Sequence, residues 1–360
     1  QWAYRILHTP RPLMEKMTLF WHGHFATSAV KVEDAGLMQR QNDVLRAHSL
    51  GDFQELLLEI SRDPAMLLYL DSASNRKAHP NENYAREIME LFSLGEGNYS
   101  EGDIRELARC FTGWEIKRKK FRFNRYQHDT GVKEFLGVEG DFGGEEAVRI
   151  VASQEATPKF IVRKLLRFFI SDDLNLSEAL VEPLANQLTR DELRIAPTLQ
   201  QILSSNLFFS PHSRARKIRS PVEFGAGFLL ALDGTTDCFQ LANSFHELGQ
   251  GLYMPPSVKG WDGGRDWINS STLLGRANLV QRLVSGGKTR FAKGSLPEWV
   301  AANGIDDAGA LVDRLSVLLA AVEVPQRFKQ QIVESADSGP GDWSTQVTRA
   351  FCALPEFQLS

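Results

Sequence analysis

Apolar residues recur at intervals of three and four along most of this chain, and this spacing constrains the fold more than any other feature. Leu13, Met17 and Phe20 show it directly after Pro12. Residues three or four positions apart lie on one face of an α-helix, so each such segment has a single apolar stripe. We expect helices at 13–21, 35–48, 53–60, 64–70, 82–94, 101–110, 144–153, 158–170, 177–188, 197–204, 222–232, 272–284, 308–322, 326–335 and 345–352. The sequence therefore predicts a mainly α, large multi-helical globular domain.

Two segments break the helical pattern. Between 117 and 136, Phe121 and Phe123 alternate with polar residues, which favours one small β-hairpin. Residues 249–270 combine glycines and two prolines with Tyr253, Trp261 and Trp267, and a loop of this length inside a compact domain is often functional. We expect both to be inserted in a helical core domain over 1–286. A C-terminal helical segment, 287–360, is expected to pack on that core.

Composition narrows the function classes. The net charge of −4 gives no global field that would select nucleic acid or an anionic membrane. No apolar run approaches the roughly 18 residues of a transmembrane helix, so no transmembrane segment is predicted. The three cysteines are widely spaced and form neither a zinc motif nor a disulfide framework, so we expect buried thiols.

The helix expected over 82–94 carries the densest polar face. Glu87 and Glu90 are one turn apart, as paired carboxylates for acid–base chemistry or metal binding would be. Asn83 and Arg86 share this face and could orient a substrate. The alternative is a solvated face with ion pairs such as Glu82 with Arg86, and the spacing alone favours this simpler interpretation.

The segment His22-Gly23-His24 indicates a second candidate site. An H-x-H pair is typical of metal sites, and His22, His24 and Glu87 would together offer ligands for a divalent metal ion. On a helix, however, residues two apart point about 200° from each other. His24 continues the apolar stripe and should face inward, which favours a buried histidine that is hydrogen-bonded to a carbonyl or carboxylate.

Two loop residues are further candidates, each with a structural alternative. His128 precedes Asp129 directly after the expected strand, which allows a catalytic role but is more typical of an Asx turn. Trp261 could form a stacking wall for a sugar, because tryptophan faces bind the apolar faces of sugars. It could equally pin the glycine-rich loop to the core.

Two groups of basic residues stand out in the sequence. Six lie between 117 and 125, where they could bind an anionic polymer or protect an exposed strand edge, and we favour the second role. Lys159, Arg163, Lys164 and Arg167 follow helical spacing and are expected to form a solvated face. The acidic net charge argues against a nucleic-acid partner.

Short segments spread over nearly the whole chain match one family in order: 16–25, 63–66, 70–71, 81–95, 108–114, 128–129, 135–137, 220–223, 255–256, 260–261 and 355–358. Through these segments the chain resembles the bacterial DUF1800 family, a domain of unknown function. The resemblance implies a mainly helical protein that is often exported, to the periplasm or outside the cell, and often encoded beside a sulfatase-like partner. It implies no established activity, and we expect no signal segment within residues 1–360.

From the residues and the resemblance together, we expect an exported, hydrolase-like enzyme that acts on a polar, carbohydrate-type polymer. The alternative is a non-catalytic helical binding or assembly module that works with an exported partner protein. In the first case the expected roles are catalysis by Glu87, Glu90, His24 and His128, and substrate binding by Asn83, Arg86 and Trp261.

Overall fold

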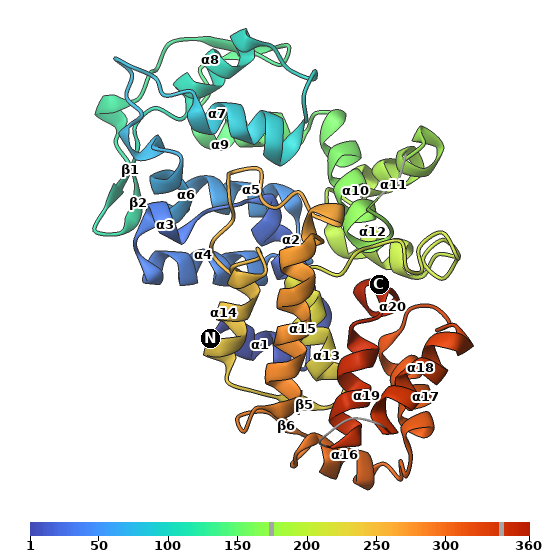
Figure 1. Cartoon of the computed structure of the whole chain (residues 1–360). Coiled ribbons are helices and arrows are strands. Elements are labelled where there is room, and N and C mark those ends of the chain that lie inside the picture. The colour runs from blue at the N-terminus through green and yellow to red at the C-terminus, as the bar shows by residue number, and fades with distance from the viewer. Residues whose placement is uncertain (173–175, 338–341) are drawn as a thin grey trace.

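The computed structural model describes residues 1–172, 176–337 and 342–360. Over these residues the chain is 60% helical, with twenty α-helices and three small two-stranded antiparallel sheets (Figure 1). The prediction of a mainly α, multi-helical protein is confirmed. None of the described helices is long and apolar enough to cross a bilayer.

The elements have the following bounds. The helices are α1 Trp2–His8, α2 Pro12–His24, α3 Ala29–Val32, α4 Ala35–Ala47, α5 Phe53–Arg62, α6 Pro64–Tyr69, α7 Asn83–Glu87, α8 Glu101–Cys110, α9 Gly144–Ala152, α10 Ala156–Phe169, α11 Glu178–Arg190, α12 Ile195–Leu203, α13 Pro221–Ala231, α14 Cys238–Glu247, α15 Ser270–Ser285, α16 Leu296–Ala302, α17 Ala308–Leu319, α18 Gln326–Asp337, α19 Trp343–Cys352 and α20 Pro355–Gln358. The strands are β1 Trp114–Lys117, β2 Lys120–Phe123, β3 Lys133–Phe135, β4 Val138–Gly140, β5 Gly234–Thr235 and β6 Arg290–Phe291. A π-helical turn, Ile88–Ser93, continues α7.

Capping side chains stabilise the start of several helices. Asp52 accepts a hydrogen bond from the backbone N–H of Glu55 at 3.0 Å and so caps α5. At α8 a capping box forms: the Ser100 N–H donates to Asp103 at 2.7 Å, and the Asp103 N–H donates to the Ser100 hydroxyl at 3.2 Å. Local sequence therefore fixes where these helices begin.

The region of the expected hairpin contains two hairpins. Strands β1 and β2 pair antiparallel, with Lys117 opposite Lys120, and β3 pairs with β4. Arg118 and Lys119 both have positive φ, 53° and 60°, as a tight two-residue turn between twisted strands requires. The predicted hairpin is confirmed in kind, while its strands begin at residue 114, earlier than expected.

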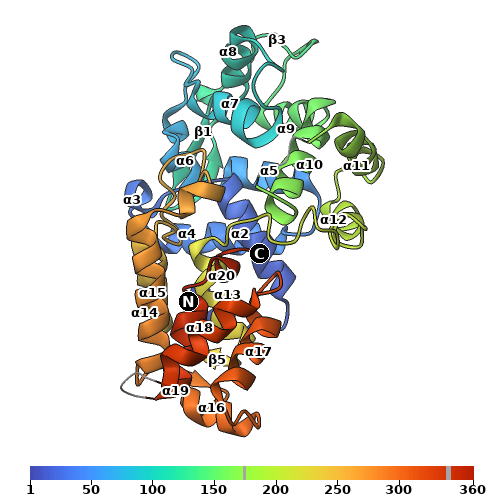
Figure 2. The ribbon, with the colours of Figure 1, turned by 45° about the vertical axis from the view of Figure 1, so that its right-hand side comes forward.

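The buried apolar residues group into two large clusters that divide the molecule into two halves. The first cluster gathers residues from α2 to α12, and the second gathers α1 with residues from α13 to α20. Helix α2 contributes to both: Phe20 and Trp21 belong to the first cluster and Leu19 to the second. Figure 2 shows α2 between the teal and green half and the yellow and red half.

The predicted domain boundary near residue 287 stays a prediction. Helix α15, which ends at Ser285, packs in the same apolar cluster as α16 and α17. Apolar packing is therefore continuous across that position within the second half.

The loop 249–270 lies against the C-terminal end of α2, where the two halves meet. Its backbone is fixed there by two hydrogen bonds, from the Ala29 N–H to the Tyr253 carbonyl at 2.8 Å and from the Tyr253 N–H to His22 Nε2 at 3.1 Å. Gly260 has φ +86°, and a Cβ at this position would lie 2.2 Å from the carbonyl oxygen of Gly23. Only glycine allows the loop to approach α2 this closely.

Candidate functional site

A cleft of about 800 Å³ opens at the junction of the two halves. Its walls come from α2, the π-helical turn, α10, residues 217–223 and the loop 259–267. Three residues singled out from the sequence, His24, Glu90 and Trp261, line this cleft. Its volume is typical of small-molecule and substrate sites. Helices, a π turn and a glycine-rich loop that are far apart in sequence thus form one cavity.

A lysine–histidine pair lines the cleft. Lys164 Nζ, on α10, donates hydrogen bonds to His24 Nδ1 at 3.1 Å and to the Leu91 carbonyl at 2.9 Å. His24 Nε2 lies 3.0 Å from the Phe92 carbonyl. Because a carbonyl only accepts, Nε2 carries the imidazole proton and Nδ1 is left as an acceptor for the amine. His24 therefore orients Lys164.

The π-helical turn supplies the two carbonyls. The N–H groups of Leu94 and Gly95 both donate to the Met89 carbonyl, at 2.8 and 3.0 Å. The carbonyls of Leu91 and Phe92 are consequently left at the end of the helix, where carbonyls have no helical partner and the helix dipole favours a cation. Such turns are frequent at functional sites.

Electrostatics set the protonation of the pair. Burial lowers the pKa of Lys164 to about 7, and its amine lies 4.7 Å from the centre of the Phe160 ring. Within the described residues it has no carboxylate at ion-pair distance. Burial also lowers the pKa of His24 well below its ordinary value, and the charge of Lys164 lowers it further. His24 is therefore neutral at pH 7.

The two carboxylates predicted to act as a pair, Glu87 and Glu90, do not both line the cleft. Glu90 lines the cleft, and its Oε2 accepts a hydrogen bond from the Tyr99 hydroxyl at 2.9 Å. Burial, together with this carboxylate, raises the pKa of Tyr99 to about 12. Glu87 is partly buried outside the cleft lining, and burial and the Glu90 charge raise its pKa. The wider π turn explains why one turn of separation does not give one shared face.

Asn83 and Arg86 lie on the outer surface of α7. Arg86 donates to both oxygens of Glu101, at 2.7 and 2.8 Å, and lies 3.7 Å from Glu82. Asn83 is exposed, and its N–H donates to the side chain of Asn81. The structure thus supports the solvated, ion-paired alternative for this part of the helix and places neither residue in the cleft lining.

His22 and His24 point to different sides of α2, as helical geometry predicts. His22 is buried, accepts the Tyr253 N–H, and packs edge-on against Trp2 at 5.2 Å. Burial lowers the pKa of His22 to about 4. Across residues 1–172, 176–337 and 342–360, no group of three or more His, Cys, Asp or Glu is placed to hold a metal ion. His22, His24 and Glu87 therefore do not assemble the expected ligand set.

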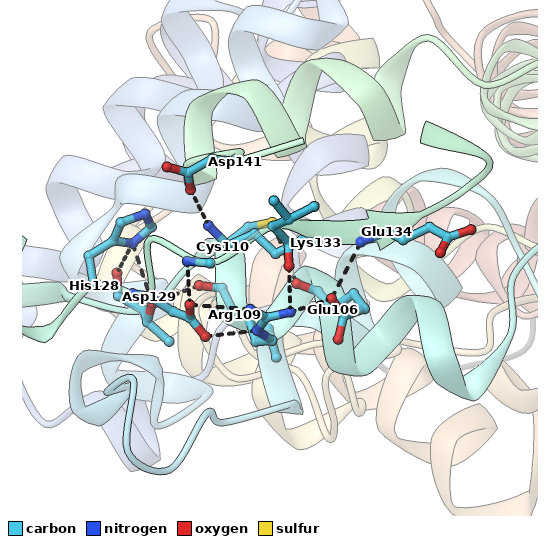
Figure 3. A network of polar contacts seen from close by, with 12 residues as sticks. Glu106, Arg109, Cys110, His128, Asp129, Lys133, Glu134 and Asp141 are labelled. Carbon is cyan, nitrogen blue, oxygen red and sulfur yellow. Dashed lines mark hydrogen bonds and ion pairs between the residues drawn. The ribbon is translucent and has the colours of Figure 1, made fainter. Parts of the chain in front are cut away.

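His128 belongs to a separate polar network that joins α8 to the hairpins (Figure 3). Its Nδ1 lies 2.8 Å from the Thr112 carbonyl, and the Arg109 guanidinium donates to both oxygens of Asp129, at 2.7 and 3.2 Å. Arg109 holds the pKa of Asp129 at about 2. The Gly131 N–H donates to Asp129 at 2.8 Å, which is the expected Asx turn. His128 does not line the cleft.

Two further charged residues of the cleft, Lys217 and Glu223, were not singled out from the sequence, and Lys16 contacts Glu223 from outside the cleft lining. Lys16 and Lys217 both face the carboxylate of Glu223, the latter at 3.8 Å, and each amine lies about 5 Å from the centre of the Phe168 ring. Burial alone would raise the pKa of Glu223, but the two lysines hold this pKa well below its ordinary range. Lys16 is far in sequence from Lys217 and Glu223, so no local pattern brings the three together.

The basic stripe on α10 divides between solvent and cleft. Lys159 pairs with Glu155 at 2.7 Å and Arg163 pairs with Glu178, as expected for a solvated face. Lys164 and Arg167 line the cleft instead. The sequence spacing of Phe160, Lys164, Arg167 and Phe168 could have predicted this cleft wall, because these residues share one helical face.

Trp261 forms part of the cleft wall contributed by the loop. Its ring lies 5.5 Å from that of His22, and Trp267 lines the same side. The indole N–H of Trp261 is buried and has no hydrogen-bond partner in the part of the chain that the structure describes. The predicted stacking wall and the predicted pinning of the loop are therefore compatible.

Comparison with known proteins gives one match. Residues 1–359 match the model of a family described as protein of unknown function, DUF1800. No curated protein and no solved structure matches the chain.

Proposed function

This chain belongs to the DUF1800 family, whose function is unknown, and from that premise we propose that the cleft is the active site of a hydrolase-like enzyme. The proposed substrate is a polar, carbohydrate-type polymer. The cleft combines titratable groups with aromatic walls, and tryptophan faces stack on sugars.

The observation that supports this proposal most is Lys164. A lysine with a pKa of about 7 is populated in both forms at neutral pH, so it can give and take a proton. Its two hydrogen bonds, to His24 and to the Leu91 carbonyl, fix the position of the amine in the cleft wall. A structural lysine would instead pair with a carboxylate or extend into solvent.

Each cleft residue has a distinct proposed role. Lys164 protonates the leaving oxygen of the glycosidic bond, while Glu90 accepts a proton from the attacking water, whose oxygen bonds to the anomeric carbon. Tyr99 fixes the orientation of Glu90. His24 is a positioning residue, because both of its nitrogens are engaged and it is neutral. Trp261 and Trp267 stack on the sugar.

The second candidate is a non-catalytic binding or assembly module. It is favoured by the polar groups that are already satisfied within the protein, such as Arg86 with Glu101 and His128 with Thr112. In that case the cleft holds a glycan without cleaving it.

A glycan panel with matched variants separates these candidates. We expect the parent protein to release reducing ends from at least one polysaccharide. Lys164→Met and Glu90→Gln should each lower the rate by about 10² or more, the usual worth of an acid or base. Arg86→Gln, outside the cleft, should match the parent. Folded Lys164→Met and Glu90→Gln proteins that retain parental rates would contradict the enzyme, and binding without turnover by the parent would favour the module.

The proposal includes an exported location, periplasmic or extracellular, and a sulfatase-like exported partner. Both rest on the family resemblance. Fractionation of cells that express the full-length protein tests the location, and co-purification from the same cells tests the partner.

A further inference from the structure

Two cations on α10 face the cleft without a carboxylate partner. Lys164 and Arg167 are three residues apart, so they lie on the same side of the helix, and both line the cleft. Arg167 has no hydrogen bond or ion pair to any described residue, and the hydrogen bonds of Lys164 are to the Leu91 carbonyl and His24. Lys164 is therefore held by neutral acceptors, and Arg167 has no partner among the described residues.

Neighbouring cations are compensated within the protein, which makes these two exceptional. Lys259 pairs with Asp262 at 2.6 Å on the rim of the cleft, and Lys217 shares Glu223 with Lys16. On the outer side of α10, Lys159 and Arg163 each have a glutamate partner. The amine of Lys164 is desolvated, and a desolvated cation is costly unless it is paired, whereas Arg167 is exposed and open to a ligand from solvent.

No described carboxylate of the cleft compensates the charge of Lys164. Glu90 accepts a hydrogen bond from the Tyr99 hydroxyl. Burial is the cause of the lowered pKa of Lys164, and no carboxylate contributes to that shift. Phe160 lies beside the amine and offers an apolar surface next to the cations. A ligand that combines an anionic group with an apolar ring face would satisfy both features.

We infer that the substrate of the cleft is an acidic carbohydrate whose anionic group binds between Lys164 and Arg167. This inference rests on the proposed function for the carbohydrate, while the anion site follows from the unpaired cations. The planar guanidinium of Arg167 matches the paired oxygens of a carboxylate or a sulfate ester. Lys164 adds a point charge on the inner side, and Trp261 and Phe160 contact the ring.

Binding measurements with charged and uncharged oligosaccharides test the inference. Calorimetric titrations would compare oligogalacturonate with its carboxyl-reduced form, and a chondroitin sulfate oligosaccharide with its carboxyl-reduced, desulfated form. We expect at least one acidic oligosaccharide to bind, its uncharged form to bind at least about tenfold more weakly, and added salt to weaken the binding. The preferred acidic partner identifies the group as carboxylate or sulfate.

A matched pair of variants on one helix provides the control. Arg167→Gln should lower the affinity for the acidic oligosaccharide about tenfold or more, because a charged hydrogen bond is lost. Arg163→Gln, whose arginine pairs with Glu178, should change it less than twofold. Thermal melting confirms that both variants are folded. Equal affinity for charged and uncharged forms, or unchanged binding by Arg167→Gln, would overturn the inference.

The two proposals can fail separately. Acidic oligosaccharides that bind through Arg167 without turnover would remove the hydrolase and keep the anion site. Turnover of a neutral glycan that Arg167→Gln leaves unchanged would keep the hydrolase and remove the anion site.

Discussion

At the residue scale, Lys164 is the central group of the cleft chemistry, and its surroundings disfavour its charged form. Lys164→Met keeps the length of the side chain and removes the buried amine. We expect the melting temperature to stay the same or rise, because a desolvated charge without a carboxylate partner is lost. Thermal denaturation checks this, and a large loss of stability would show that the amine is structural.

His24→Ala provides the contrasting variant. It removes the partner of the Phe92 carbonyl and of the Lys164 amine, both of which are shielded from water. We expect the free energy of unfolding to fall by about 1–3 kcal/mol or more, since unsatisfied polar groups and a cavity both destabilise. Urea denaturation measures it, and a neutral result would contradict the positioning role.

The lowered pKa of Lys164 predicts a pH dependence of stability. The pKa is about 7 in the folded protein and near 10.4 in the unfolded chain. Between these values the unfolded state binds more protons, so this group makes the protein more stable as pH rises above 7, by at most about 1.4 kcal/mol per pH unit. The stability difference between the parent and Lys164→Met should therefore shift toward the parent from pH 7 to pH 9. A difference that stays constant would show that the amine titrates normally.

Sequence patterns identified some cleft residues and missed others for definable reasons. His24 could be placed inward because it continues an apolar stripe, and Trp261 because it interrupts a glycine-rich loop. The position of Lys164 could not be predicted, because a basic residue at helical spacing is usually solvated. Lys164 is buried only because α2 and the π turn pack against it in the folded protein. Glu223 becomes part of the cleft through tertiary contacts with Lys16 and Lys217.

At the element scale, the loop 249–270 is predicted to depend on Gly260. Gly260→Ala introduces a Cβ about 2.2 Å from the Gly23 carbonyl at φ +86°, so the loop must lift from α2. Gly137→Ala is the matched control, because φ is +79° there and no atom lies within 4 Å. The control should cost about 1 kcal/mol from backbone strain alone. We expect Gly260→Ala to cost clearly more and to weaken ligand binding, and equal effects of the two variants would contradict the docking of the loop.

The network around His128 is predicted to be structural. Asp129→Asn removes the charged partner of Arg109 and should lower the free energy of unfolding by about 1.5–3 kcal/mol. The difference from the parent should shrink as pH falls toward 2, where Asp129 becomes protonated. Ligand binding and turnover at 25 °C should be unchanged, and a selective loss of activity would instead return His128 and Asp129 to the functional site.

Element prediction succeeded where helices carry their own signals. Capped, strongly periodic segments such as α5 and α8 were found within two residues. Short helices such as α1, with seven residues, were missed because isolated helices of this length are marginal and packing on the second cluster stabilises them. The π turn at Ile88–Ser93 was also missed, since α and π turns bury similar apolar residues.

At the scale of the whole molecule, two apolar clusters meet along α2, and the cleft opens at that junction. A ligand bound there contacts residues from both halves, with the π turn and α10 on one side and residues 217–223 and the loop 259–267 on the other. Binding should therefore also resist separation of the halves and raise the melting temperature of the protein as ligand concentration increases.

Hydrogen exchange with and without a binding oligosaccharide tests the central claim, that this cleft is the functional site. We predict slower exchange of backbone amides in three segments together: 88–95, 160–168 and 259–267. Exchange in the basic hairpin, 114–123, should not change. Protection confined to that hairpin, or protection that leaves all three cleft segments unaltered while the ligand is bound, would place the functional site elsewhere and contradict the account.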